Sequence, residues 1–297
     1  MVEKITITQV RAIARTTLLL GEKTILSGKN GSGKTTIIEA LHTTGWGRSF
    51  RTQQIQDLIA DSERSAAWRI TGATSGVDWQ YTTHITQKEK TTEDISGSSL
   101  RSCRSVWENF LAITHSADRH ELVAGAPSAR RSLLFSSAIL GSEGRDLYRK
   151  YHAIYKRRLA LIKSSRAYDG EADRPWVSLL WQHGIPLRAI LRRELAAILH
   201  AAQRITPFEL SAHYIQQDPE LSLSDMIEYH LREVAPIEYA AKRILMGPQR
   251  DDVFIEFNGK SARDRASRGQ QRLSALALDA ALAQHAADQY GYPILFM

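Results

Sequence analysis

The chain has 297 residues, enough for about two domains, and its 43% hydrophobic and 24% charged residues exclude a wholly disordered protein. A single cysteine, Cys103, excludes an intramolecular disulfide and a cysteine-based zinc site. The sequence contains no run of 18 apolar residues, and residues 1–10 alternate in character instead of forming the apolar core of a signal peptide. We therefore expect a cytoplasmic protein without a membrane partner.

The net charge of +7 is concentrated in one segment. Residues 145–166 carry eight basic side chains and a single acid, Asp146, so this stretch alone has a net charge of +7. Such a stripe favours a polyanionic partner, and the alternative is a solvated helix face. The basic residues are Arg145, Arg149, Lys150, Lys156, Arg157, Arg158, Lys163 and Arg166.

The N-terminal segment has a strand–loop–helix pattern. Residues 4–8 alternate in the manner of a strand, and residues 18–27 contain a second strand that ends at 24–26. A glycine-rich loop follows at 28–33, and residues 35–44 have helical periodicity. The pattern predicts a loop held between a strand and a helix.

The middle of the chain is predicted to be mostly helical. Residues 66–85 alternate with period two on both sides of a turn at 74–76, which predicts a hairpin, and residues 86–102 are predicted to be a loop. Residues 128–236 have helical periodicity. Within them we expect helices over the basic segment and over 188–204, with short breaks at Asp169-Gly170 and Thr206-Pro207.

The last part of the chain returns to a mixed pattern. It predicts a strand at 253–257, a turn at Asn258-Gly259, a helix at 269–289 and a buried strand at 292–297. The fold class is therefore α/β. We expect one α/β domain with a mostly helical domain inserted into it, and a serial arrangement of two domains is the alternative.

The glycine-rich loop matches the phosphate-binding pattern G-x-x-x-x-G-K-[ST] at every position. Its glycines let backbone N–H groups surround phosphate oxygens, and the following helix adds a favourable dipole. Lys34 would reach the β- and γ-phosphates of a nucleotide, and the Thr35 hydroxyl would bind Mg²⁺. The alternative is a structural glycine turn that happens to precede Lys-Thr. The nucleotide-binding loop consists of Gly28, Lys29, Asn30, Gly31, Ser32, Gly33, Lys34 and Thr35.

A second motif lies directly before the last predicted helix. The residues Ser267, Gly269 and Gln270 resemble the S-x-G-Q signature of ABC-type ATPases, which contacts the γ-phosphate held by the phosphate-binding loop of a partner subunit. Ser267 suits a helix cap, and Gly269 permits close approach of the backbone to a phosphate. Taken alone, the pattern fits an ordinary helix start as well as it fits the ABC signature.

The combination of motifs resembles the RecF family, the bacterial recombination and gap-repair ATPases related to the SMC and Rad50 heads. The resemblance extends from Ile5 to Met297, and the joint spacing of the motifs is more specific than any one of them. Besides the two motifs above, it rests on Gly47-Arg48-Ser49-Phe50-Arg51-Thr52, Leu122-Val123-Ala124-Gly125-Ala126-Pro127, Arg130-Arg131, Gly247-Pro248-Gln249-Arg250-Asp251-Asp252 and Pro293-Ile294-Leu295-Phe296-Met297.

The resemblance implies a P-loop head of the ABC type with two lobes. Residues 1–105 would begin the ATPase lobe, 106–245 would form a helical second lobe, and 246–297 would return to the first. RecF-like proteins bind ATP and Mg²⁺, form an ATP-dependent homodimer, hydrolyse ATP slowly and bind single-stranded or gapped DNA. They act with RecO and RecR to load RecA. The candidate DNA contacts in this chain are Arg149, Lys150, Lys156, Arg157 and Arg158.

Several positions depart from the family pattern. Gln249 replaces a histidine, Phe135 replaces an acidic residue, and residues 115–120 differ from the usual F-S-P-E-D-L. The two Walker B carboxylates, which support Mg²⁺ and polarise the attacking water, would follow Met297. We therefore expect the printed sequence to be part of a longer chain, and a pseudo-ATPase that binds without hydrolysing is the alternative.

Two other functions fit parts of the pattern. A P-loop phosphotransferase would use the basic helix to bind a small anionic metabolite, but it has no use for the S-x-G-Q motif. An ATPase subunit of an ABC transporter would require a membrane partner, and the inserted region lacks a transporter-type signature.

Overall fold

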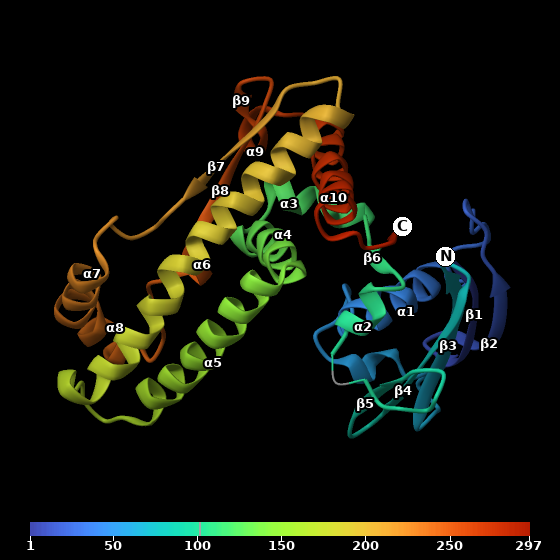
Figure 1. Cartoon of the computed structure of the whole chain (residues 1–297), viewed down its shortest axis with the longest axis horizontal. Coiled ribbons are helices and arrows are strands. Elements are labelled where there is room, and N and C mark those ends of the chain that lie inside the picture. Colours follow the sequence, from blue (N-terminus) through green and yellow to red (C-terminus); the bar gives the residue numbers. More distant parts are fainter. Residues whose placement is uncertain (101) are drawn as a thin grey trace. The chain divides into compact units, whose positions relative to one another are not determined.

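The computed structural model describes residues 1–100 and 102–297, apart from the side chain of Ala117 (Figure 1). Residue 101, which belongs to the predicted loop at 86–102, lies outside the described residues. The contacts divide the chain into two units, one of residues 1–115 with 287–297 and one of residues 116–286. Within the described residues, no helix is both long and apolar enough to cross a membrane.

The first unit is built around a five-stranded antiparallel sheet of order β2-β1-β3-β4-β5. Alternate residues of its strands, such as Ile5, Ile7, Trp68 and Ile70, are buried because successive side chains of a strand point to opposite faces. The strands are β1 (Val2–Val10), β2 (Ile13–Leu19), β3 (Ser65–Thr74), β4 (Val77–Thr86) and β5 (Lys90–Glu93).

The predicted hairpin is confirmed as β3 and β4, joined by a tight turn in which Ser75 and Gly76 both have positive φ. The predicted loop at 86–102 is wrong in part, because Lys90–Glu93 pairs with β4 as the edge strand β5. Its short polar sequence has no hydrophobic alternation. An edge strand can form without such alternation, because only one of its sides is hydrogen-bonded to a neighbouring strand.

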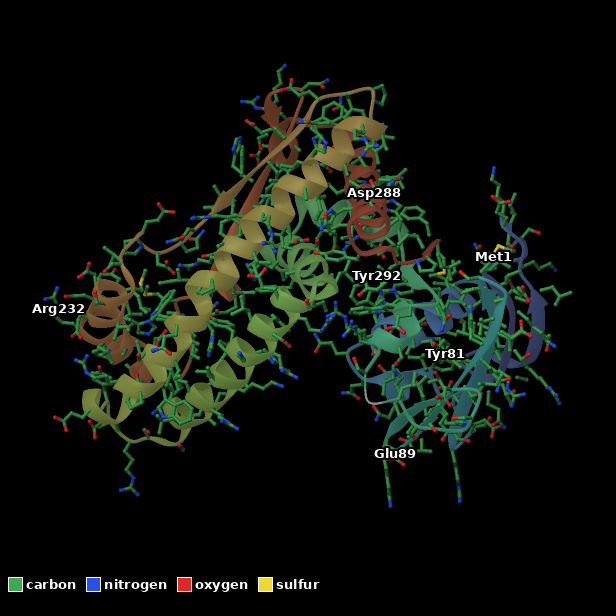
Figure 2. The ribbon with its side chains drawn as sticks, viewed as in Figure 1. Met1, Tyr81, Glu89, Arg232, Asp288 and Tyr292 are labelled. Atoms are coloured by element: carbon green, nitrogen blue, oxygen red, sulfur yellow. The ribbon has the colours of Figure 1, made fainter. Side chains whose placement is uncertain are left out.

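Helix α1 (Lys34–Trp46) follows the glycine-rich loop and buries Ile37, Ala40 and Leu41. Two further strands of this unit, β6 (Leu111–Ile113) and β10 (Ile294–Phe296), form a separate parallel sheet. The remaining short helices are η1 (Ile55–Leu58) and α2 (Arg104–Trp107). Tyr81 ties β4 to α2, since its hydroxyl donates to the Ser105 carbonyl at 2.7 Å (Figure 2).

The strand predicted at 24–26 does not form. Residues 24–26 belong to no described strand, and the side chain of Ile25 is 93% exposed. Instead the Gly21 N–H donates to Thr24 Oγ1 at 3.0 Å, a local turn that competes with extended pairing. Hydrophobic alternation predicted the strand, but a strand also needs a neighbouring backbone to pair with.

The second unit is mainly helical, as predicted for 128–236. The predicted breaks at Asp169-Gly170 and Thr206-Pro207 mark the two ends of its longest helix, in which the Asp169 side chain caps the backbone N–H groups of Glu171 and Ala172. The helices are α3 (Glu121–Ala124), α4 (Pro127–Leu140), α5 (Ser142–Ser164), α6 (Gly170–Ile205), α7 (Leu223–Tyr229), α8 (Ala235–Ala241), α9 (Ala262–Arg265) and α10 (Arg268–Tyr290), with the short 3-10 helices η2 (Ala117–His120) and η4 (Pro248–Arg250) and the π-helical segment η3 (His230–Val234).

A three-stranded antiparallel sheet accompanies these helices. Strand β7 (Leu210–Ile215), which the helical prediction for this region missed, pairs with β8 (Asp252–Phe257), and β8 pairs with β9 (Lys260–Ser261). The predicted turn at Asn258-Gly259 is confirmed, with positive φ at both residues. Strand β8 and helix α10 also confirm the strand and the helix predicted near the end of the chain.

Candidate nucleotide-binding site

The phosphate-binding loop has the backbone geometry that its sequence predicts. Gly31 and Gly33 have φ of 81° and 92°, a region in which other residues are strained. A side chain at Gly33 would also collide with Ile13, since its Cβ would lie 2.6 Å from Cγ1. The glycines are therefore required by the shape of the loop.

Lys34 stands at the first position of α1 and folds back over the loop. Its Nζ donates to the carbonyl oxygens of Gly28 and Lys29, both at 2.8 Å. The Ser32 N–H bonds the Lys29 carbonyl at 3.2 Å and tightens the same turn. The Lys34 amine is thus held beside the loop, next to the N-terminus of α1. The first backbone N–H groups of a helix lie at that end.

The N-terminus of α1 has no side-chain cap and no acid in its first turn. The first N–H groups of a helix have no partner inside it, and their dipoles favour an anion. The loop before them is largely exposed. These features together form a cradle for phosphate groups.

Thr35 is the metal-binding candidate, and it is exposed at the second position of α1. Among the described residues, no group of three or more His, Cys, Asp or Glu side chains could hold a metal ion. A single hydroxyl fits Mg²⁺ only as part of a metal–nucleotide complex, in which phosphate oxygens and water supply the other ligands.

Sequence reasoning missed Glu39, a buried carboxylate on α1 that fixes the helix to neighbouring segments. The side chain of Glu39 is fully buried and accepts from Arg11 through Nε at 2.8 Å and Nη2 at 2.9 Å. Arg51 Nη1 lies 3.3 Å from it, and the Ser49 hydroxyl also donates to it. Glu39 therefore joins the phosphate-binding helix to Arg11, which follows β1, and to the motif at 47–52, which follows the helix. The sequence signal for this buried ion pair was an acid, Glu39, on the apolar side of a predicted helix.

The signature residues begin α10 as a reciprocal cap. The Gln270 N–H donates to Ser267 Oγ at 3.3 Å, and the Ser267 N–H donates to Gln270 Oε1 at 2.8 Å. Gly269 has no such internal role. It is exposed, its φ is not positive, and an added Cβ would find only Ser267 Oγ at 3.9 Å.

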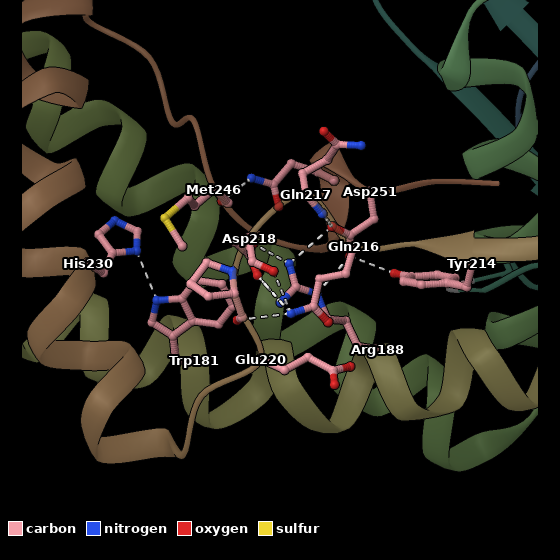
Figure 3. A network of polar contacts seen from close by, with 12 residues as sticks. Trp181, Arg188, Tyr214, Gln216, Gln217, Asp218, Glu220, His230, Met246 and Asp251 are labelled. Atoms are coloured by element: carbon pink, nitrogen blue, oxygen red, sulfur yellow. Dashed lines mark hydrogen bonds and ion pairs between the residues drawn. The ribbon is translucent and has the colours of Figure 1, made fainter. Parts of the chain in front are cut away.

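The polar residues of 247–252 are engaged inside the second unit (Figure 3). Asp251 accepts from Arg188 at 2.7 Å, from the Tyr214 hydroxyl at 2.7 Å and from the Gln217 N–H at 3.2 Å. Burial and the adjacent Asp251 carboxylate raise the pKa of Tyr214 well above its usual range. Arg188 also binds Asp218 and lies over the Trp181 ring. The motif thus joins α6 to the strands β7 and β8.

The departures from the family pattern also have internal partners. Gln249 accepts from the Tyr151 hydroxyl and donates to the Met246 carbonyl at 2.6 Å. Phe135 packs on Tyr148 with ring centroids 5.2 Å apart. In the segment 115–120, Arg119 binds Asp279 of α10 at 2.8 Å.

Four of the five candidate DNA contacts in the basic stripe are exposed, and the fifth is buried. Arg149, Lys150, Lys156 and Arg157 are exposed on α5, and Arg149 has a solvent-exposed partner in Asp146 at 3.3 Å. The prediction that Arg158 contacts DNA is wrong. Its side chain is fully buried and binds two carboxylates, Asp173 at 2.7 Å and Glu238 at 2.5 Å. The other four predicted contacts stay predictions.

The phosphate-binding loop, the helix that follows it and the signature motif are elements of a P-loop ATPase head of the ABC type, here with an added helical unit. The sequence pattern of the family described as "RecF/RecN/SMC N terminal domain" matches residues 1–290, and the chain belongs to this family. Within it, the chain resembles RecF.

Two relatives illustrate the likeness. The DNA replication and repair protein RecF of Bifidobacterium longum subsp. infantis is 28% identical over 295 residues, which cover 92% of this chain and 72% of the relative. RecF of Thioalkalivibrio sulfidiphilus is 29% identical over 282 residues, with coverage of 91% and 75%. A solved structure of the recombination mediator protein RecF with ATP has a TM-score of 0.88 at 19% identity and covers 99% of this chain and 83% of its own. That structural match establishes the fold.

Proposed function

We propose that this chain is an ATP-binding head that pairs with a second copy across bound ATP and binds DNA in recombinational and gap repair. One observation carries the proposal most directly. The fold itself does not require a glycine at position 269, whereas an anion approaching the start of α10 from outside the chain does. A glycine inside a helix costs about 1 kcal/mol relative to alanine, so its presence needs a reason beyond the helix.

ATP would bind at the phosphate-binding loop. Residues 28–35 would surround the phosphates, Lys34 would contact the β- and γ-phosphates, and Thr35 would hold Mg²⁺ together with the nucleotide. The metal would offset phosphate charge. Ser267, Gly269 and Gln270 of one copy would lie on the γ-phosphate bound by the other, which makes ATP a ligand for dimerisation.

DNA would bind along the exposed side of α5. Three exposed arginines of α6 already have carboxylate partners, namely Arg174 with Glu228, Arg192 with Glu220 and Arg193 with Glu143. In the described part of the chain, Lys150, Lys156 and Arg157 have no ion pair of this kind. Three exposed cations on one helix without acidic partners suit a phosphate backbone.

The relatives support the biological setting. Curated relatives are DNA replication and repair proteins, and a similar structure is a recombination mediator of the RecFOR pathway. By this likeness the chain would act in the cytoplasm with RecO and RecR on single-stranded or gapped DNA and would help to load RecA.

The decisive experiment replaces Gly269 by glutamate and measures ATP-dependent dimerisation by analytical ultracentrifugation. The new carboxylate would meet the partner's γ-phosphate, so the variant should bind ATP as a monomer and fail to dimerise. Arg272→Glu, one turn further along α10, makes the net charge more negative by two units instead of one, and as a control for charge alone it should still dimerise better than Gly269→Glu. Normal ATP-dependent dimers of Gly269→Glu would return the motif to an ordinary helix start.

A further inference from the structure

A second group of exposed cations surrounds the signature motif. Residues 260–272 contain five basic residues and one acid, a net charge of +4. All five basic side chains are exposed. We call these residues the corner patch: Lys260, Arg263, Arg265, Arg268 and Arg272.

Among the described residues, no acid neutralises the corner patch. Its one acid, Asp264, accepts a hydrogen bond from the Ser261 hydroxyl at 2.7 Å and accompanies the cap of α9. Within the described residues, no member of the patch forms an ion pair, in contrast to the acid-paired arginines of α6. A surface group of like charges without acidic partners has a positive potential, and the patch therefore attracts a polyanion.

The patch extends over three consecutive elements, β9, α9 and the start of α10, at one end of the second unit (Figure 1). Arg263 lines a hollow of about 170 Å³ beside Phe254 of β8 and Ile215 of β7. Arg268 and Arg272 are four residues apart on α10 and share a face of that helix. The cations are thus distributed from the sheet to the helix.

We propose that the corner patch binds the phosphate backbone of DNA as a second contact besides α5. The inference rests on the DNA-binding part of the proposed function. An extended polyanion fits better than a single nucleotide phosphate, because in the proposed dimer Ser267, Gly269 and the start of α10 would already bind one phosphate. Lys260 and Arg263 lie on other elements than that helix start. Cations that contact phosphates do not read bases, so the contact is independent of sequence.

The test uses a triple variant that leaves α10 intact, Lys260→Gln, Arg263→Gln and Arg265→Gln. Binding to a gapped duplex is measured by fluorescence anisotropy between about 50 and 300 mM NaCl, and ATP-dependent dimerisation is measured in parallel. Each lost phosphate contact flattens the salt slope by about 0.9 and lowers affinity on the order of tenfold at about 0.1 M salt. We expect a slope flatter by up to about 2.7 with unchanged dimerisation. The matched control is Arg174→Gln, Arg192→Gln and Arg193→Gln, which removes three acid-paired cations and should keep the wild-type slope.

Three results would overturn the inference. An unchanged salt slope in the corner variant would show that DNA does not touch the patch. Loss of ATP-dependent dimers with normal DNA affinity would assign the patch to the partner's nucleotide. An equal loss in the control variant would reduce the effect to net charge. A wild-type protein that binds no DNA would instead defeat the proposed function itself, whereas wild-type binding that depends on α5 but not on the patch would remove only this inference.

Discussion

Arg158 and Asp173 form a two-point ion pair in which neither side chain is exposed to solvent. Arg158 donates through Nε at 3.0 Å and through Nη2 at 2.7 Å, and its third nitrogen binds Glu238. Glu238 in turn accepts from His230 Nε2 at 3.0 Å, while His230 Nδ1 accepts from the indole N–H of Trp181 at 2.9 Å (Figure 3). The indole can only donate, which places the proton of a neutral His230 on Nε2.

This pair makes Arg158 a structural residue, and its neighbour provides a direct comparison. Arg158→Met would leave two buried carboxylates without their cation, which costs about 3–5 kcal/mol of unfolding free energy. Arg157→Met changes an exposed side chain and should stay within about 0.5 kcal/mol of wild type. Urea unfolding followed by circular dichroism measures both. Equal stability of the two variants would contradict the buried pair.

The same cluster predicts a dependence of stability on pH. Burial opposes ionisation of Glu238, but the hydrogen bond from His230 and the charge of Arg158 outweigh it and lower the pKa of Glu238 below its ordinary 4.5. A lowered folded-state pKa means that the stabilisation is present above about pH 4.5 and is lost as pH falls through the folded-state pKa. Glu238→Gln should therefore be less stable at pH 7 and lose less stability on acidification. Thermal unfolding from about pH 7 to pH 3 tests this, and Glu228→Gln, from an exposed pair, should follow wild type in its pH dependence.

Lys34 should dominate nucleotide affinity. Lys34→Ala removes a charge-assisted contact of about 1.5–3 kcal/mol, so ATP should bind roughly ten- to a hundredfold more weakly. Calorimetric titration with ATP and Mg²⁺ measures the change. Thr35→Ala should weaken binding in the presence of Mg²⁺ more than in EDTA, and unchanged ATP affinity in a folded Lys34→Ala variant would exclude the phosphate role.

The exposed cations of α5 should contribute to DNA affinity without affecting ATP. Replacing Lys150, Lys156 and Arg157 by glutamine should flatten the salt slope on duplex DNA by up to about 2.7, because each phosphate contact contributes about 0.9. The loss should be the same for unrelated DNA sequences. If the triple variant keeps the wild-type salt slope of DNA binding, these side chains do not contact DNA and the helix face is only solvated. Arg158 is left unchanged because its replacement would report on folding.

Two glycines should respond in opposite directions to alanine. Gly269→Ala adds a Cβ in open space on a helix, so it should raise the unfolding free energy by up to about 1 kcal/mol. Gly33→Ala should lower it, because φ is 92° and the Cβ would lie 2.6 Å from Ile13. Thermal unfolding of both variants without nucleotide provides the measurement. A destabilised Gly269→Ala would give this glycine a structural purpose.

The lobe boundaries expected from sequence stay predictions, but several local elements follow from contiguous residues. The phosphate-binding loop, the Ser267–Gln270 cap and the hairpin turn at Ser75 and Gly76 each depend on backbone geometry within a few residues. A glycine or a capping side chain determines such geometry by itself. For this reason the residue pattern alone locates both candidate motifs for nucleotide binding.

Tertiary structure decided which charged residues are available for a ligand. Arg157 and Arg158 are adjacent and chemically identical in the sequence, yet one is exposed and the other is buried against Glu238, 80 residues away. Glu39 binds Arg11, 28 residues earlier in the chain. Residues 24–26 belong to no described strand, although their local pattern predicted one. Burial and pairing depend on what distant segments bring to the same place. The sequence by itself therefore determined the local phosphate-binding motifs, and only the tertiary structure separated the surface cations from those that hold the helical unit together.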